Sequence, residues 1–294
     1  MSRRHAILGA LAALVAFAPF TAATAQAPFK VGSKNFTEQF VLAELYAQAL
    51  EANGIKVERK INLGGTLIAH KALEEKQIDF YPEYTGTILL AVMKQEPMTD
   101  PKAVYDKVKA DYAARGLVVL NQAPVNNTYN MVVRPETAAQ YKLETLSDLA
   151  KVAKELKLGA GPEFRDRKDG LPGLQAKYGI VFKEDLQMAI GLRYQALAGK
   201  QIDVVNGYAT DGMISALKLK RLKDDKNLWP PYYVVPVVRK EALDANPKIA
   251  DVLNQVSALL DEAALADMNY KVDGDKMEPR DVAHDFLKAK GVVR

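Results

Sequence analysis

A short segment occurs twice in the sequence, and this repeat constrains the fold more than any other feature. Residues 72–79 read ALEEKQID and residues 196–203 read ALAGKQID, with six identities in eight positions. A tyrosine stands 12 residues after the first alanine of each copy, Tyr84 in one and Tyr208 in the other. Each copy has the pattern of a helix end, a buried strand and a tyrosine just beyond that strand. The repeat therefore predicts two similar lobes, each with a tyrosine at the carboxyl end of a strand, where open α/β sheets bind ligands.

Length and composition narrow the class of protein. The 294 residues give room for about two domains, since a single core usually stops growing near this size. The 40 basic and 36 acidic residues are interspersed without a basic stripe, so we expect no nucleic-acid partner. The sequence has no cysteine, which excludes disulfides, thiolate metal sites and a cysteine nucleophile.

Residues 1–25 have the pattern of a cleaved secretory signal. Arg3 and Arg4 form its positive part, and residues 6–17 form an apolar run that is too short for a membrane span. Small residues allow cleavage after Ala25 or Ala27, and we favour Ala25 because the other site would leave a proline at the new amino terminus. We therefore expect a soluble protein that is exported to the periplasm.

The remaining sequence alternates strand and helix patterns, which is typical of an α/β fold with mostly parallel sheets. Asn35 stands three residues before Glu38, the spacing of a helix-capping pair. The pattern predicts strands over 29–32, 57–63, 78–81, 129–134 and 234–238, and helices over 37–52, 67–76, 146–156, 170–178, 185–199 and, in several pieces, 241–290.

The same pattern divides the chain into two lobes. Lobe I is expected over 28–126 together with 234–294, and lobe II over 127–233. Because the last segment is long enough to return to lobe I, the chain would cross between the lobes twice. Two such crossings would form a hinge.

The residues offer little for catalysis. The sequence has no Gly-x-Ser-x-Gly, no His-Glu-x-x-His and no phosphate-binding Gly-x-x-x-x-Gly-Lys motif. We expect His70 and His284 to be packing or surface residues of helices. Asp79 and Asp203 recur at strand starts, where they more readily fix a turn than act as paired acids. An enzyme is therefore the weaker hypothesis, and we expect no metal or cofactor.

Tyrosines point instead to binding. The sequence has 13 tyrosines and one tryptophan, and four of the tyrosines fall at predicted strand or loop ends. Rings that face one another can hold a quaternary ammonium by cation–π attraction, whereas an ammonium with N–H groups would lose hydrogen bonds to water. The four candidates are Tyr84, Tyr129, Tyr208 and Tyr232.

Three polar residues are candidates for a ligand carboxylate. Lys34 follows the first strand, and Thr87 begins a helix whose free N–H groups favour an anion. Arg167 lies in a polar loop of lobe II, where its guanidinium could take a carboxylate with two hydrogen bonds. Arg165 in the same loop competes for this role.

Several motifs across the chain resemble the substrate-binding proteins of osmoprotectant ABC importers, which bind glycine betaine, choline and carnitine. These motifs are VGSKNFTEQ at 31–39, LGGT at 63–66, EYTGT at 83–87, PEF at 162–164, DGLP at 169–172 and PPY at 230–232. The resemblance implies a two-lobed periplasmic binding-protein fold of type II, with two crossovers. It also implies an aromatic cage of Tyr84, Tyr129, Tyr208 and Tyr232, with carboxylate recognition by Lys34, Thr87 and Arg167.

The expected function is therefore capture of a quaternary ammonium osmoprotectant, glycine betaine first, and its delivery to an ABC permease driven by a cytoplasmic ATPase. We expect a monomer. Another cationic ligand, such as choline, carnitine, ergothioneine or an amino acid, is the main alternative. An enzyme on the same scaffold, or a sensor domain that contacts other proteins, are further alternatives.

Overall fold

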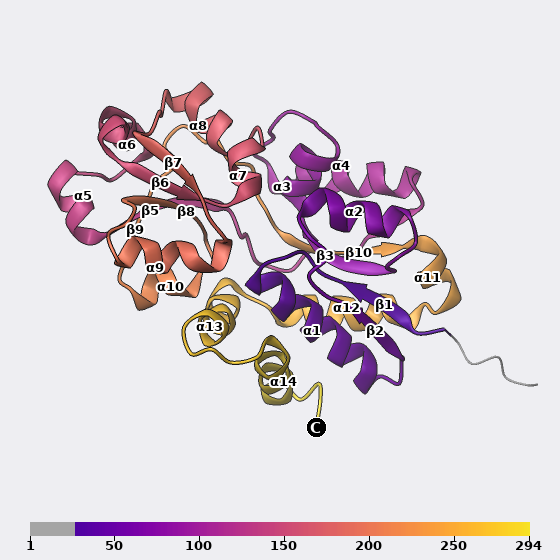
Figure 1. Ribbon diagram of the computed structural model, residues 1–294. Helices are drawn as coiled ribbons and strands as arrows, with labels where there is room; N and C mark the ends of the chain where they lie inside the picture. Colours follow the sequence, from indigo (N-terminus) through magenta and orange to yellow (C-terminus); the bar gives the residue numbers. More distant parts are fainter. Residues whose placement is uncertain (1–26) are drawn as a thin grey trace, which may run out of the picture.

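The computed structural model describes residues 27–294, which form two five-stranded sheets, each flanked by helices (Figure 1). The first sheet has the order β2-β1-β3-β10-β4. Strands β1, β2 and β3 run parallel, and β10 pairs antiparallel with both β3 and β4. The strands span Phe29–Gly32 (β1), Val57–Lys60 (β2), Phe80–Tyr84 (β3), Leu117–Val119 (β4) and Val234–Arg239 (β10).

The second sheet repeats this arrangement strand for strand. Its order is β7-β6-β8-β5-β9, with β6 parallel to β7 and β8, and with β5 antiparallel to β8 and β9. Strand β8 therefore occupies the place that β3 has in the first sheet. The strands span Tyr129–Val133 (β5), Lys157–Ala160 (β6), Glu184–Gln187 (β7), Val204–Tyr208 (β8) and Lys220–Leu222 (β9).

The sequence repeat lies at equivalent places in the two sheets, immediately before β3 and β8. Lys76 and Lys200 both adopt the left-handed conformation, with φ of 62° and 59°, just after a helix. The next residue in each copy donates its backbone N–H to the first alanine of the repeat, over 2.8 and 3.0 Å. The KQID identity thus encodes one helix-ending turn, used twice.

Asp79 and Asp203 fix the start of equivalent strands, as the sequence pattern predicts. Asp79 accepts the backbone N–H of Lys30 at 2.8 Å and pairs with Arg239 at 2.7 Å. Asp203 accepts the backbone N–H of Lys157 at 3.0 Å and pairs with Arg134 at 2.9 Å. Each carboxylate therefore joins a parallel neighbour strand to an antiparallel one.

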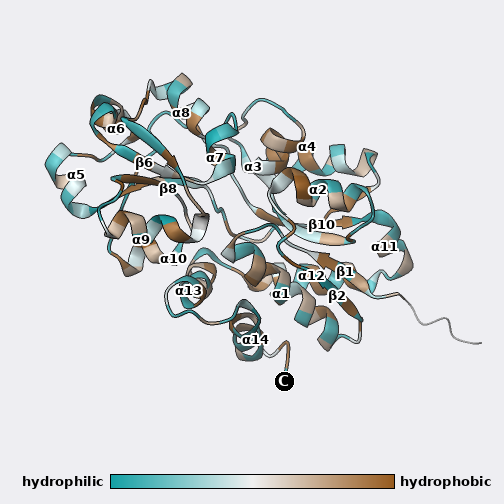
Figure 2. Ribbon diagram, in the orientation of Figure 1, coloured by the Kyte–Doolittle hydropathy of each residue, from teal (hydrophilic) through white to brown (hydrophobic). Residues whose placement is uncertain are grey.

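Helices cover both sheets and enclose apolar cores. Central strands such as β8 and β10 are largely hydrophobic in Figure 2, whereas outer helices such as α11 are mostly hydrophilic. Helix α1 is buried along most of its length and packs against α12 and α14. The helices on the side of the first sheet are α1 (Thr37–Ala52), α2 (Thr66–Glu74), α3 (Thr85–Thr87), α4 (Pro101–Ala114), α11 (Lys240–Ala245), α12 (Lys248–Leu259), α13 (Glu262–Asp273) and α14 (Pro279–Ala289). Those of the second are α5 (Pro135–Tyr141), α6 (Leu146–Val152), α7 (Pro162–Asp166), α8 (Leu171–Tyr178), α9 (Arg193–Ala198) and α10 (Gly212–Ala216).

The chain crosses between the sheets twice, after β4 and again before β10, so the prediction of two crossovers is confirmed. The two connecting segments, 120–128 and 223–233, lie side by side. Asn126 forms an antiparallel bridge with Tyr233, and the N–H of Asn127 donates to the carbonyl of Tyr232 at 3.0 Å. The crossings are therefore hydrogen-bonded to each other where they pass from one sheet to the other.

Two local predictions are wrong. The predicted helix over 185–199 is instead strand β7, a 3₁₀ turn over Ile190–Leu192 and the short helix α9. The first part of this segment is a strand because it pairs with β6 at the edge of the sheet. Its residues are exposed and have no apolar alternation, so the sequence pattern does not reveal the strand. Asn35 does not cap α1, whose N-cap residue is Phe36, without a side-chain hydrogen bond.

The predicted signal peptide, residues 1–25, lies outside the described residues. Over 27–294, no helix is both long and apolar enough to cross a lipid bilayer.

Candidate functional site

A cavity of about 30 Å³ lies between the two sheets, and all seven candidate residues line it. From the first sheet come Lys34, after β1, Tyr84, at the end of β3, and Thr87 in α3. The second sheet contributes Tyr129 and Tyr208, which pair directly across β5 and β8. Arg167 follows α7, and Tyr232 lies in the second crossing. The complete lining is Lys34, Phe36, Tyr84, Thr87, Asn127, Tyr129, Glu163, Arg167, Tyr208 and Tyr232.

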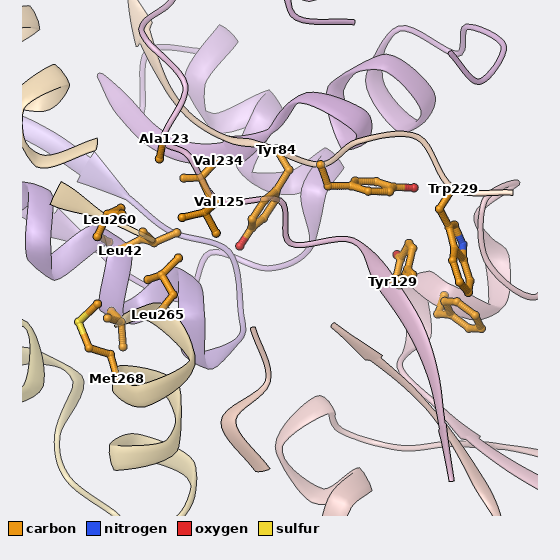
Figure 3. Close-up of a cluster of buried hydrophobic side chains, with 14 of the residues drawn as sticks. Leu42, Tyr84, Ala123, Val125, Tyr129, Trp229, Val234, Leu260, Leu265 and Met268 are labelled. Carbon is orange, nitrogen blue, oxygen red and sulfur yellow. The ribbon is translucent and has the colours of Figure 1, made fainter. Parts of the chain in front are cut away.

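Five aromatic rings form one connected group at this cavity. Tyr129 stacks near Tyr208 with ring centres 5.2 Å apart, and it meets Tyr232 edge to face at 5.6 Å. Phe36 lies nearly parallel to Tyr84 at 6.4 Å and to Tyr208 at 6.0 Å. In Figure 3, Tyr84 lies between an aliphatic group that includes Leu42 and Val125 and the aromatic side chains of Tyr129 and Trp229.

The four tyrosine rings stay neutral at physiological pH. Burial raises the pKa of Tyr84, Tyr129 and Tyr232 well above 10, and it raises the pKa of Tyr208 as well. A neutral phenol keeps the partial negative charge of its ring face. The cavity wall can therefore attract a cation without itself carrying phenolate charge.

Lys34 has a protein partner within the site. Its side-chain nitrogen is 2.5 Å from the carboxylate of Glu83 and 3.4 Å from the hydroxyl of Thr66. The same nitrogen lies over two rings, 4.7 Å from the centre of Tyr84 and 5.5 Å from that of Phe36. The structure thus shows an ammonium held by two of the cavity's rings.

Arg167 is fixed by Asp169. Two guanidinium nitrogens of Arg167 donate to the Asp169 carboxylate at 2.8 and 2.6 Å, and Tyr232 donates its hydroxyl to the same carboxylate. The Arg167 guanidinium also lies over the ring of Tyr129, 5.8 Å from its centre. Arg165 instead pairs with Asp185 and donates to Gln187, and it does not line the cavity. Of the two arginines that the sequence left as alternatives, Arg167 therefore lines the cavity and Arg165 does not.

Close packing positions Thr87 and Tyr232. The short helix α3 passes so near the second crossing that a Cβ on Gly86 would lie 2.7 Å from both the Pro231 carbonyl and the Tyr232 ring. Thr85 stabilises the same contact, because its N–H donates to the carbonyl of Tyr233 at 2.9 Å and its hydroxyl donates to the carbonyl of Pro231 at 3.2 Å.

A buried arginine lies behind Tyr208. Arg193 is 1% exposed, and its guanidinium is 4.8 Å from the centre of the Tyr208 ring. Asp211 binds Arg193 at 2.5 Å and accepts the backbone N–H of Tyr208 at 2.8 Å. Together these two residues fix the position of the ring at the end of β8.

Glu163 makes a contact from one side of the cavity to the other. Its carboxylate accepts the backbone N–H of Thr66 at 2.5 Å and the Thr66 hydroxyl at 3.2 Å. Thr66 begins α2 on the side of the first sheet, whereas Glu163 belongs to α7 on the side of the second. The positive end of α2 favours a carboxylate at this place.

Sequence reasoning assigned no role to two residues of the lining, Phe36 and Glu163. Phe36 and Glu163 stand inside motifs that carry the family resemblance, and this is the signal that could have singled them out. Composition and periodicity contain no such signal. Among the described residues, no cluster of three or more histidine, aspartate or glutamate side chains could hold a metal ion.

Comparisons with known proteins show the family of this chain. The family model for the substrate binding domain of ABC-type glycine betaine transport systems matches residues 27–289. A glycine-betaine-binding protein of Pseudomonas aeruginosa is 37% identical over 281 residues, covering 92% of this chain and 90% of that protein. An ergothioneine transport permease/ergothioneine binding protein of Helicobacter pylori is 34% identical over 267 residues, covering 90% of this chain and 48% of that protein.

Comparison with solved structures identifies the fold. A solved structure described as a glycine betaine/carnitine/choline ABC transporter superposes with a TM-score of 0.75 at 33% identity, covering 90% of this chain and 99% of that one. The predicted type II periplasmic binding-protein fold is thereby confirmed. The chain belongs to the family of substrate-binding domains of ABC-type glycine betaine transport systems, and it is a transport binding protein rather than an enzyme.

Proposed function

We propose that this protein captures a quaternary ammonium osmoprotectant, glycine betaine first, in a cage of Tyr84, Tyr129, Tyr208 and Tyr232. The observation that carries the proposal is the convergence of these neutral, buried rings on one cavity between two sheets. A trimethylammonium group has no N–H, so it gives up no hydrogen bonds of its own when it leaves water, and the ring faces offset the loss of hydration of its charge.

The proposed ligand carboxylate would be held by Lys34, Thr87 and Arg167. Each of them lines the cavity, Lys34 is buried, Arg167 is half-buried, and both cations lie over rings of the cage. A guanidinium offers several N–H groups, so Arg167 can bind a ligand while it keeps its contact to Asp169.

Capture by hinge closure follows from the size of the cavity. A volume of about 30 Å³ suits one or two water molecules, so a trimethylammonium ligand needs the rings or the sheets to move apart. We propose that lobe I (28–126 with 234–294) and lobe II (127–233) open about the two crossings and close on the ligand. The closed protein, a periplasmic monomer after removal of its signal, would then deliver the ligand to a membrane permease with a cytoplasmic ATPase.

Isothermal titration calorimetry with glycine betaine, choline, carnitine, ergothioneine and proline betaine tests this function. At least one of these ligands should bind with micromolar to millimolar affinity. L-proline and trimethylamine, which carry N–H groups when protonated, are the matched controls and should bind more weakly. Failure of every quaternary ligand to bind would contradict the proposal.

One observation favours a cation without a carboxylate as the second candidate. Lys34 and Arg167 already have protein carboxylates as partners, in Glu83 and Asp169. A choline-like ligand needs neither cation. Substitution Arg167→Ala separates the candidates, because it should weaken betaine binding much more than choline binding if the carboxylate is recognised there.

A further inference from the structure

Glu38, in the first turn of α1, is a buried carboxylate that contacts the cage from behind. It is 3% exposed, and four side chains donate hydrogen bonds to its two oxygens. Oε1 accepts from the Tyr84 hydroxyl at 2.7 Å and from Asn127 at 2.8 Å. Oε2 accepts from Asn269 at 2.9 Å and from the hydroxyl of Thr210. These donors come from the end of β3, the first crossing, the loop after β8 and helix α13, so Glu38 lies where several elements meet.

The orientation of the two amide side chains that donate to Glu38 is fixed by their other hydrogen bonds. The carbonyl oxygen of the Asn127 side chain takes the backbone N–H of Thr210 at 3.2 Å, so its amide nitrogen must face Glu38. The amide nitrogen of Asn269 also donates to the Thr210 carbonyl at 2.9 Å, which fixes its orientation in the same way. The four partners satisfy both oxygens of Glu38, and this fixes the position of its carboxyl group.

This carboxylate has no cationic partner among the described residues. The pKa of Glu38 is raised above its usual value, because burial outweighs the opposing hydrogen bonds from Thr210, Tyr84 and Asn269, and nearby Asp211 raises it further. A buried charge without an opposite charge lowers stability unless something offsets it. Such a group beside a binding cavity is a candidate for a functional role.

We infer that Glu38 is a positioning residue for the cation, acting through the Tyr84 phenol. The hydrogen bond from Tyr84 fixes the ring at the cavity wall and moves negative charge toward it, which strengthens the attraction of the ring face for a positive ligand. This inference rests on the proposed cage function.

A double-mutant cycle on ligand affinity tests the link. Calorimetry measures the affinity of four proteins for the quaternary ammonium ligand that binds the wild type most tightly. The four proteins are the wild type, Glu38→Gln, Tyr84→Phe and the double variant. Each single change should weaken binding by at least about fivefold. The double variant should be no more than about twofold weaker than the weaker single variant, since both changes break one link.

A merely structural role for Glu38 predicts a different result, in which the two losses multiply. Multiplying losses, or wild-type affinity in Tyr84→Phe, would overturn the inference. Should Glu38→Gln fail to fold, Tyr84→Phe alone decides, because it keeps the ring and removes only its hydroxyl. The matched control is Glu44→Gln, a buried glutamate of the same helix that pairs with Arg59, and it should leave affinity unchanged.

The outcomes also separate this inference from the proposed function. If Tyr84→Ala abolishes binding while Tyr84→Phe binds like the wild type, the result supports the proposed cage and contradicts the proposed role of Glu38. If no quaternary ammonium binds to the wild type, both fall together.

Discussion

Three of the five rings at the cavity each contact a charged residue that does not itself line the cavity. Tyr84 and Tyr232 donate their hydroxyls to Glu38 and Asp169, and the ring of Tyr208 is backed by the Arg193 guanidinium. A buried phenol needs such a partner, because an unpaired hydroxyl in a protein interior raises the free energy of the folded state. The residues behind the rings therefore set the shape of the cage as much as the rings do.

Removal of one cage ring should weaken ligand binding without unfolding the protein. We expect Tyr84→Ala and Tyr208→Ala each to reduce glycine betaine affinity about 5- to 30-fold, which corresponds to about 1–2 kcal/mol per ring. Calorimetry measures the affinity, and circular dichroism confirms the fold. Tyr141→Ala, at a tyrosine of α5 that does not line the cavity, should bind like the wild type. Equal affinity in all of these variants would show that the cage is misassigned.

Buried tyrosines also give the protein a specific sensitivity to alkali. The folded-state pKa of Tyr84, Tyr129 and Tyr232 lies well above the value of about 10 for an exposed tyrosine. Below about pH 10 both states hold these protons, so the stability is fully present. As pH rises further, the unfolded state loses protons first, and the free energy of unfolding falls. Urea denaturation between pH 8 and 11 should show a free energy of unfolding that falls above about pH 10. A free energy of unfolding that stays constant over this range would contradict the prediction.

At the scale of elements, the repeated segment predicted the equivalent helix–strand units of the two lobes, which the composition of the lobes could not predict. The KQID segments set the same turn before β3 and β8, and the tyrosines that follow reach the same cavity. By contrast, strand β7 could not be predicted, because its residues are all exposed and only pairing with β6 makes them a strand. Local pattern is informative where burial enforces it and weak at a sheet edge.

The repeated aspartates should stabilise the two sheets to a similar degree. Asp79→Asn and Asp203→Asn each remove the charge from a hydrogen-bonded arginine pair while keeping the side-chain shape. We expect each change to lower the free energy of unfolding by about 1–3 kcal/mol. Chemical denaturation measures the loss, and Asp106→Asn, at an exposed pair on α4, is the control that should change little. A marked loss of stability for only one of the two aspartates would show that they are equivalent in position but not in their contribution to stability.

The start of α2 should be sensitive to any added side chain. A Cβ on Gly65 would lie 2.2 Å from an Oε1 atom of Glu163, so Gly65→Ala must displace this carboxylate from Thr66. We expect ligand affinity to fall several-fold with little change in thermal stability, because the contact joins the two sides of the cavity. Gly191→Ala, which would meet no atom within 4 Å, is the matched control. An unchanged affinity in Gly65→Ala would mean that the Glu163 contact does not favour closure.

For the molecule as a whole, the sequence predicted the two-sheet architecture and the seven candidate residues, whose binding roles remain predictions. It did not predict the contacts that join the two sides, such as Glu163 with Thr66 or Thr210 with Glu38. These pairs are separated by many residues, and each partner taken alone resembles an ordinary surface or capping residue. Only the packing of one lobe on the other gives them a role.

Ligand binding should make the whole molecule more compact. The two crossings are paired at Asn126 and Tyr233, which limits their motion, so the sides can separate mainly by bending there and breaking the contact between Glu163 and Thr66. Because a ligand that touches both sides binds the closed form better, it shifts the population toward that form. Small-angle X-ray scattering should therefore show a smaller radius of gyration with saturating glycine betaine than without it. Substitution Glu163→Ala should enlarge the ligand-free value relative to the wild type, while Glu184→Ala, on edge strand β7, should not. A radius of gyration that is the same with and without a bound ligand would contradict capture by hinge closure.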